Sequence, residues 1–184
     1  MLKICIIIFM IISTQLFTLG HKEQQKNEKV LILIKSSKNI IRFGDEFKLT
    51  FTIINNTQIS YGFTKTYFAI NYSIYFYDAD DNELKMTSNN IIDPNIEPIK
   101  KRKFLLKPGK KKSFSILYKF DKKNSFIHTG LIERIQIPEN LNEIYAKAIY
   151  YNNDAAIKLG KERLGYNMYK GKLESEKIKI TILD

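Results

Sequence analysis

The residues best suited to chemistry in this sequence are a dense group of positive side chains near its middle. Eight of the thirteen residues at 100–112 are Lys or Arg. Such a group could contact phosphate, sulfate or carboxylate groups of an anionic polymer, in a salt-sensitive way that ignores base sequence. Alternatively, the lysines guard an exposed edge strand against pairing with other chains. The members of this lysine cluster are Lys100, Lys101, Arg102, Lys103, Lys107, Lys110, Lys111 and Lys112.

A second candidate contact is a short aromatic group late in the chain. It falls in the stretch 152–171, which has no strong hydrophobic period, and loops of that length usually carry function or a small helix. Asp154 as the N-cap of a helix and Gly160 as its C-terminal end predict one short helix there. Interface centres favour Tyr and Met. The candidates for contact with a partner protein are therefore Tyr166, Met168 and Tyr169.

Groups for catalysis or metal binding are scarce. The chain has two His and one Cys, too few for a multi-histidine or thiolate metal site, and we read His128 as a loop residue. Asp78, Asp80 and Asn82 match ligand positions of an EF-hand loop, but Glu83 stands where that loop needs Gly. A hairpin turn explains these residues better. We predict no catalytic residue, metal site or cofactor.

The first twenty residues have the pattern of a secretory signal. Lys3 precedes an apolar run at residues 4–12, and small residues precede His21, where cleavage is expected. The apolar run is too short to span a membrane, so no transmembrane segment is expected once the signal is removed. Removal would also take away the single cysteine, Cys5, and leave a formal charge of +10. We expect a secreted, periplasmic or cell-surface protein with a signal at 1–20, a flexible lead-in at 21–28 and one domain at 29–184.

The elements that must position these residues are short strands. Hydrophobic residues make up 44% of the chain, enough for an ordinary core. The sequence Lys107-Pro108-Gly109-Lys110 predicts a type II turn between two strands. Further strands are predicted around residues 29–35, 47–53, 68–77, 83–86, 131–137, 143–151 and 177–182, which gives seven to nine in all.

The alternation of side chains also predicts which faces form the core. After the Pro-Gly turn, the even-numbered Phe114, Ile116, Tyr118 and Phe120 lie on one face. In the strand after Gly44, the odd-numbered Phe47, Leu49, Phe51 and Ile53 lie on one face, and the triplet at 55–57 ends that strand. We expect these two faces to pack on each other. The fold class predicted is an all-β, antiparallel sandwich with at most one short helix in a long loop.

The succession of short motifs resembles bacterial secreted immunoglobulin-like domains. The resemblance rests on a polar turn before one strand, a Pro-Gly turn before another, a Tyr within a later strand and a closing Gly and Ser. It implies an immunoglobulin-like sandwich and makes Tyr145 a candidate tyrosine corner. The chain has no Trp and no cysteine pair, so antibody-type domains are not meant. The motifs lie at residues 44–50, 77–80, 106–110, 144–148 and 171–176.

The function that these observations favour is a non-catalytic, exported binding or accessory module. Its expected partner is an unknown protein or an anionic polymer, and no fold that reads nucleic acid sequence accompanies the lysines. An exported protease inhibitor that presents the loop at 152–171 is the alternative. A hydrolase that uses paired carboxylates is a third.

Overall fold

The computed structural model describes residues 29–64, 72–88, 103–121, 125–129, 133–152 and 154–183. The predicted signal and lead-in lie outside these residues. The described residues form thirteen strands, several of them only three or four residues long, and one helix. In chain order they are β1 (Val30–Ser36), β2 (Ile40–Arg42), β3 (Glu46–Asn55), β4 (Tyr61–Thr64), β5 (Tyr72–Tyr77), β6 (Met86–Ser88), β7 (Lys103–Leu106), β8 (Lys111–Asp121), β9 (Phe126–His128), β10 (Glu133–Gln136), β11 (Glu143–Tyr151), α2 (Asp154–Leu164), β12 (Lys172–Glu174) and β13 (Ile178–Leu183).

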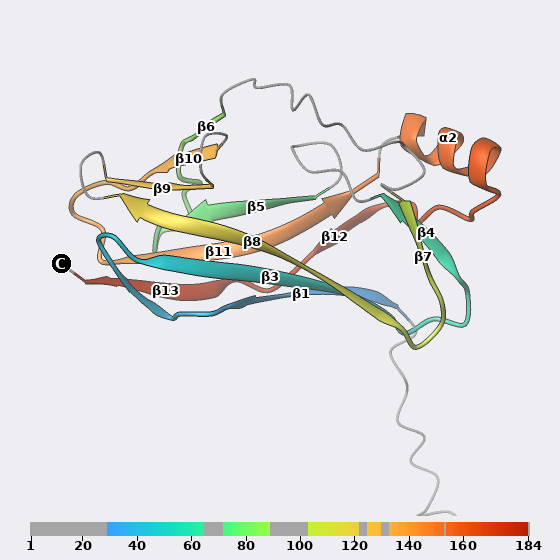
Figure 1. Cartoon of the computed structure of the whole chain (residues 1–184), viewed down its shortest axis with the longest axis horizontal. Coiled ribbons are helices and arrows are strands. Elements are labelled where there is room, and N and C mark those ends of the chain that lie inside the picture. The colour runs from blue at the N-terminus through green and yellow to red at the C-terminus, as the bar shows by residue number, and fades with distance from the viewer. Residues whose placement is uncertain are drawn as a thin grey trace, which may run out of the picture.

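Two sheets face each other and form the predicted all-β sandwich (Figure 1). Sheet A has the order β1-β3-β8-β9-β10-β6, and sheet B has the order β12-β11-β13-β2, with β5 also paired to β11. The neighbours β1-β3-β8 and β5-β11-β13 correspond to strands A-B-E and C-F-G of an immunoglobulin-like sandwich. The count of seven to nine strands was wrong, because strands such as β2, β4 and β9 are too short to show an alternation in sequence.

The core lies on the predicted faces. In β3 the side chains of Phe47, Leu49, Phe51 and Ile53 are at most 1% exposed, and in β8 those of Ile116, Tyr118 and Phe120 are buried. The register pairs Phe51 with Phe114 and Phe47 with Tyr118, whose rings lie 5.3 Å and 5.7 Å apart. β3 and β8 are therefore neighbours in one sheet. Their apolar faces together cover sheet B, rather than packing on each other as expected.

The β3–β8 pair bends back on itself at one end of the sandwich. Beyond the bend, β3 is followed by β4 and β8 is preceded by β7. These two short strands pair with each other at Phe63 and Phe104. One bend is the turn at 107–110, where Gly109 has a φ of 68° and Lys110 N donates to Lys107 O at 3.1 Å. A positive φ at the third turn residue is the mark of a type II turn, so that prediction is confirmed.

A buried amide side chain holds the two bends together. Asn55, at the end of β3, is 0% exposed, and its Nδ2 donates to Ile59 O at 2.7 Å and to Leu106 O at 2.9 Å. Its Oδ1 accepts from the backbone N and the hydroxyl of Thr57. Its backbone O accepts from Gly109 N at 2.7 Å. Every hydrogen-bonding group of the side chain is thus satisfied, as burial of an amide requires.

A small unit closes the same end of the molecule. Gly62 of β4 pairs with the segment around Met168, through Gly62 N to Asn167 O at 2.9 Å and Tyr169 N to Gly62 O at 3.0 Å. The Met168 side chain fills a slot between β4 and α2, since a Cβ on either Gly62 or Gly160 would lie within 2.6 Å of its sulfur. Gly160 therefore lies inside α2 and does not end it, contrary to the prediction. The helix ends at Gly165, which has a φ of 64°.

The face assignment predicts unequal costs for two neighbouring substitutions in β3. Phe51→Ala should lower the free energy of unfolding by about 3–5 kcal/mol, because it removes buried apolar surface and leaves a cavity. Thr52→Ala, on the outer face, should change it by no more than about 0.5 kcal/mol. Urea unfolding of both variants measures the difference, and a larger cost at Thr52 would mean that every face of β3 is reversed.

The buried amide predicts a second pair of unequal costs. Asn55→Ala should cost about 2–4 kcal/mol, because it removes the amide donor to the carbonyl groups of Ile59 and Leu106, and the Leu106 carbonyl is buried. Asn55→Asp should cost at least as much, because a carboxylate would face those two carbonyl oxygens. Asn56→Ala, one residue along and only half-buried, serves as the control and should cost about 0.5 kcal/mol or less. Equal costs at the two positions would contradict a structural role for the Asn55 side chain.

Candidate functional site

The structure divides the lysine cluster. Lys100, Lys101 and Arg102 lie outside the described residues. Lys103, in β7, is half-buried, whereas Lys107 and Lys110 flank the tip of the Pro-Gly turn and are exposed. Lys111 and Lys112 are exposed as well, and as successive strand residues they point to opposite faces of β8. The described cluster therefore consists of a cationic turn with one lysine on each face of the strand that follows it.

The charges of this turn have no ion-pair partner in the part of the chain that the structure describes. No ion pair among the described residues includes any lysine from residues 107 to 112. One ion pair, Lys38 to Asp45 at 2.7 Å, lies beside the start of β3. The other four lie on the outer face of sheet B, and they are Lys147–Glu174, Lys172–Glu174, Lys177–Asp81 and Lys179–Glu143.

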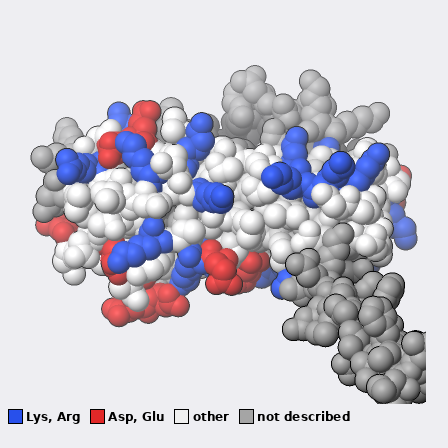
Figure 2. Space-filling model, turned by 90° about the horizontal axis from the view of Figure 1, so that it is seen from below, with Lys and Arg blue, Asp and Glu red and all other residues white. Residues whose placement is uncertain are grey.

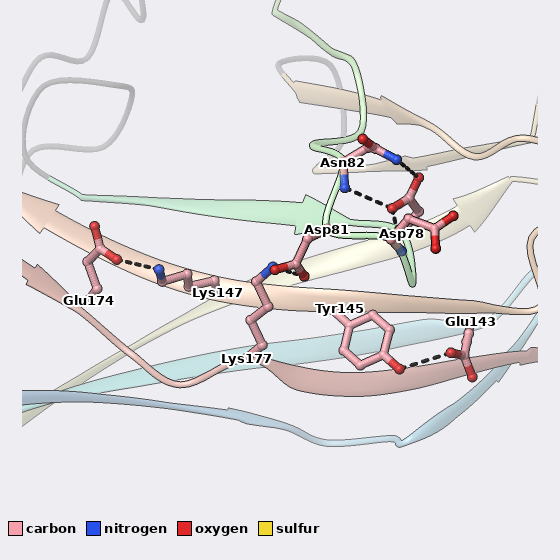
Figure 3. A network of polar contacts seen from close by, with 9 residues as sticks. Asp78, Asp81, Asn82, Glu143, Tyr145, Lys147, Glu174 and Lys177 are labelled. Carbon is pink, nitrogen blue, oxygen red and sulfur yellow. Dashed lines mark hydrogen bonds and ion pairs between the residues drawn. The ribbon is translucent and has the colours of Figure 1, made fainter.

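The outer face of sheet B carries a network of ion pairs, and Figure 3 shows two of them, Lys147 with Glu174 and Lys177 with Asp81. Hydrogen bonds from Lys147 and Lys172 lower the pKa of the Glu174 carboxyl to about 2. Those from Lys179 and Tyr145 likewise lower the pKa of Glu143. Each of these lysines thus has a carboxylate partner within the chain, and the face has little net charge to offer an anionic ligand.

Tyrosine side chains belong to the same network. The ammonium of Lys177 lies 3.8 Å from the centre of the Tyr77 ring, a cation–π contact. The hydroxyl of Tyr145 donates to Glu143 Oε1 at 2.9 Å. A tyrosine corner would instead bond to the backbone a few residues upstream. The expected corner at Tyr145 is therefore wrong, since its hydroxyl is engaged by the side chain two positions before it.

The acidic group at residues 78–83 is a hairpin turn, as predicted. Asp78 Oδ1 accepts from the backbone N of Asp80 at 2.9 Å and of Asn82 at 2.8 Å, while its Oδ2 accepts from Asn82 Nδ2. These bonds lower the pKa of Asp78. In the described part of the chain, no three His, Cys, Asp or Glu side chains come together in a way that could hold a metal ion. His128 lies in β9, not in a loop.

The outer face of sheet A continues the positive charge of the turn. Lys35 of β1, Lys48 of β3 and Lys111 and Lys119 of β8 are all exposed on this face. Figure 2 shows a row of Lys and Arg side chains in the right half of the view, the half that holds β4 and β7 in Figure 1. Sequence reasoning missed this face. The sequence shows which face of its own strand each lysine occupies. It does not show the register that aligns β1, β3 and β8.

The aromatic candidates for a partner contact belong largely to the fold. Met168 is only 2% exposed, so its side chain is not open to a partner, and that prediction was wrong. Tyr169 is half-buried, with its ring 5.5 Å from those of both Phe63 and Tyr61. Tyr166 is also half-buried beside Gly62. The missed signal was the pair of glycines, Gly62 and Gly160, between which the Met168 side chain packs.

No helix in the described ranges has the length and apolar character needed to cross a membrane.

Comparisons with known proteins give no family. No family model matches the sequence, and no curated protein matches it. Among solved structures, Spo0M, a sporulation control protein from Bacillus subtilis, aligns with 84% of this chain and 49% of its own at 11% identity and a TM-score of 0.41. A beta-glucosidase from Listeria innocua in complex with gluconolactone aligns with 84% of this chain and 16% of its own at 10% identity and a TM-score of 0.38. The chain thus spans about half and about a sixth of these two proteins, and neither likeness is close enough to support an argument about function.

Proposed function

We propose that this chain is a non-catalytic, exported binding module whose cationic turn contacts an anionic partner. The observation that carries the proposal is the contrast between the lysines on the outer face of sheet B and those at the cationic turn. Every lysine named on the outer face of sheet B is paired with a carboxylate, whereas Lys107, Lys110, Lys111 and Lys112 are exposed and take part in no ion pair among the described residues. Unbalanced charge at a surface raises the local concentration of counter-ions and of anionic ligands.

The fold keeps this turn in one conformation. The backbone of Asn55 bonds to the turn on both sides, from Gly109 N to Asn55 O at 2.7 Å and from Asn55 N to Lys110 O at 3.0 Å. The Asn55 side chain bonds in addition to Leu106, which directly precedes the turn. A preorganised turn loses less conformational entropy when it binds, so the lysines are better placed than on a free loop.

The protease-inhibitor alternative loses the feature that motivated it. The stretch expected to present an inhibitory loop contains the predicted helix, α2, and the segment around Met168 packs against β4. An inhibitory loop must stand out from its scaffold to enter a protease cleft. The described part of this stretch instead contributes to closing the end of the sandwich.

Replacing the turn lysines should weaken binding to a polyanion without changing stability. The unaltered protein should bind heparin with a log–log salt slope near −3 or steeper, if four or more charges are neutralised at roughly 0.7–0.9 counterions each. The triple variant Lys107→Gln, Lys110→Gln, Lys111→Gln should flatten that slope by about 2.1 to 2.7, since three charges are lost. Its melting temperature should barely change, because exposed charges contribute little to folding.

A charge-matched control separates this surface from net charge alone. Lys158, Lys161 and Lys170 are exposed and lie on or after α2, so replacing all three by Gln should leave the slope nearly unchanged. Equal effects of the two triple variants would contradict the proposal. If instead the turn variant binds heparin normally but scatters more light as it aggregates, the lysines guard the edge of β8.

A further inference from the structure

The strand register lines up a regular array of side chains on the outer face of sheet A. Three successive rows cross β1, β3 and β8 at this face, a fourth crosses β3 and β8 alone, and neighbouring rows lie about 6.8 Å apart, two residues along a strand. The first row begins next to the cationic turn. From the turn onward the rows are Leu31–Ile54–Lys111, Leu33–Thr52–Ser113, Lys35–Thr50–Ser115 and Lys48–Leu117.

The middle rows carry paired hydroxyl groups. Thr52 Oγ1 lies 2.8 Å from Ser113 Oγ, and Thr50 Oγ1 lies 2.8 Å from Ser115 Oγ. Each pair uses one hydroxyl proton for its internal bond. The second proton and the remaining lone pairs are within reach of a ligand, because both pairs are exposed and a hydroxyl both donates and accepts. Two short rows of donors and acceptors thus lie between positive side chains.

The charge of this array is uniformly positive. In its four rows, Lys111, Lys35 and Lys48 are exposed and belong to no ion pair among the described residues, and no described side chain in these rows is acidic. Among the paired residues of β1, β3 and β8 next to these rows, the first carboxylate is Glu46, one row further along, where it stands opposite Lys119. With the turn, the positive side chains form a track that follows the strand direction for about 20 Å or more.

We propose that this face binds an anionic polysaccharide that lies along the strands and continues onto the cationic turn. The inference rests on the proposed function and names the chemistry of the partner. Lysines would pair with sulfate or carboxylate groups, and the threonine and serine hydroxyls would exchange hydrogen bonds with sugar hydroxyls. Leu33 and Leu117, 45% and 53% exposed, supply aliphatic contact for the C–H faces of the sugars. Single-stranded nucleic acid fits less well, because the four rows present no aromatic ring on which a base could stack.

The test compares heparin oligosaccharides of two lengths by calorimetry at several salt concentrations. A disaccharide can occupy only the turn or one row, whereas a dodecasaccharide can follow the whole track. The variant Lys35→Gln, Lys48→Gln should flatten the salt slope for the dodecasaccharide by about 1.4 to 1.8, since two charges are lost. Its affinity for the disaccharide should stay within about twofold, because the turn is unchanged. The control Lys158→Gln, Lys161→Gln should alter neither.

A second variant tests the hydroxyl rows separately from charge. Thr52→Val with Ser113→Ala should lower the affinity for the dodecasaccharide about fivefold or more, because hydrogen bonds to the polymer are lost. The salt slope should not change, since a hydroxyl releases no counterion. Thr181→Val with Ser73→Ala, the same exchange on sheet B, is the control. Equal affinities of the two hydroxyl variants would overturn a role for the rows.

The outcomes distinguish this inference from the proposed function. If the triple turn variant flattens the dodecasaccharide slope but Lys35→Gln, Lys48→Gln does not, the polymer meets only the turn, and the extended face is refuted while the proposed function stands. If neither variant changes the slope, both are refuted. Oligo(dT) of the same charge that binds as tightly as the dodecasaccharide would overturn the choice of a polysaccharide.

Discussion

The buried amide of Asn55 is the interaction on which the shape of the cationic end depends. A two-stranded ribbon has no reason of its own to fold back, and the backbone carbonyl groups at its bends need hydrogen-bond donors. The Nδ2 of Asn55 bonds to two of these carbonyl groups, at Ile59 and Leu106, and its backbone bonds to the Pro-Gly turn. One side chain thereby fixes the path of β3 into β4 and of β7 into β8. The position of Lys107 and Lys110 follows from that path.

The two outer faces of the sandwich use charge in different ways. On sheet B, lysines and carboxylates face each other across strands, and the hydrogen bonds between them hold the pKa of Glu174 near 2. Such exposed pairs add little to stability, but they cancel each other's field. On sheet A and at the turn, Lys35, Lys48, Lys107, Lys110 and Lys111 take part in no ion pair among the described residues. Unbalanced positive charge gathered at one surface is the arrangement that electrostatic steering requires.

The sequence allowed the parts of the fold that depend on local patterns to be predicted. The alternation in β3 and β8 predicted their buried faces, and Pro108-Gly109 predicted the turn, because both signals lie within a few residues. Asn55 looked like an ordinary strand end, since its partner Leu106 is fifty-one positions away. Gly160 looked like a helix end, because nothing in the local sequence shows that the Met168 side chain occupies the space that a Cβ at position 160 would fill. The rows on sheet A depend on the register between β1, β3 and β8, which no short pattern encodes.

Amide hydrogen exchange at the Pro-Gly turn tests most directly whether Asn55 fixes this end of the molecule. Gly109 N donates to Asn55 O, and Asn55 N donates to Lys110 O. Both should exchange about as slowly as the core amides of β3, which open only when the protein unfolds globally. The measurement is native-state exchange by NMR at neutral pH. Exchange of Gly109 at the rate of an unprotected surface turn would contradict a turn held by Asn55.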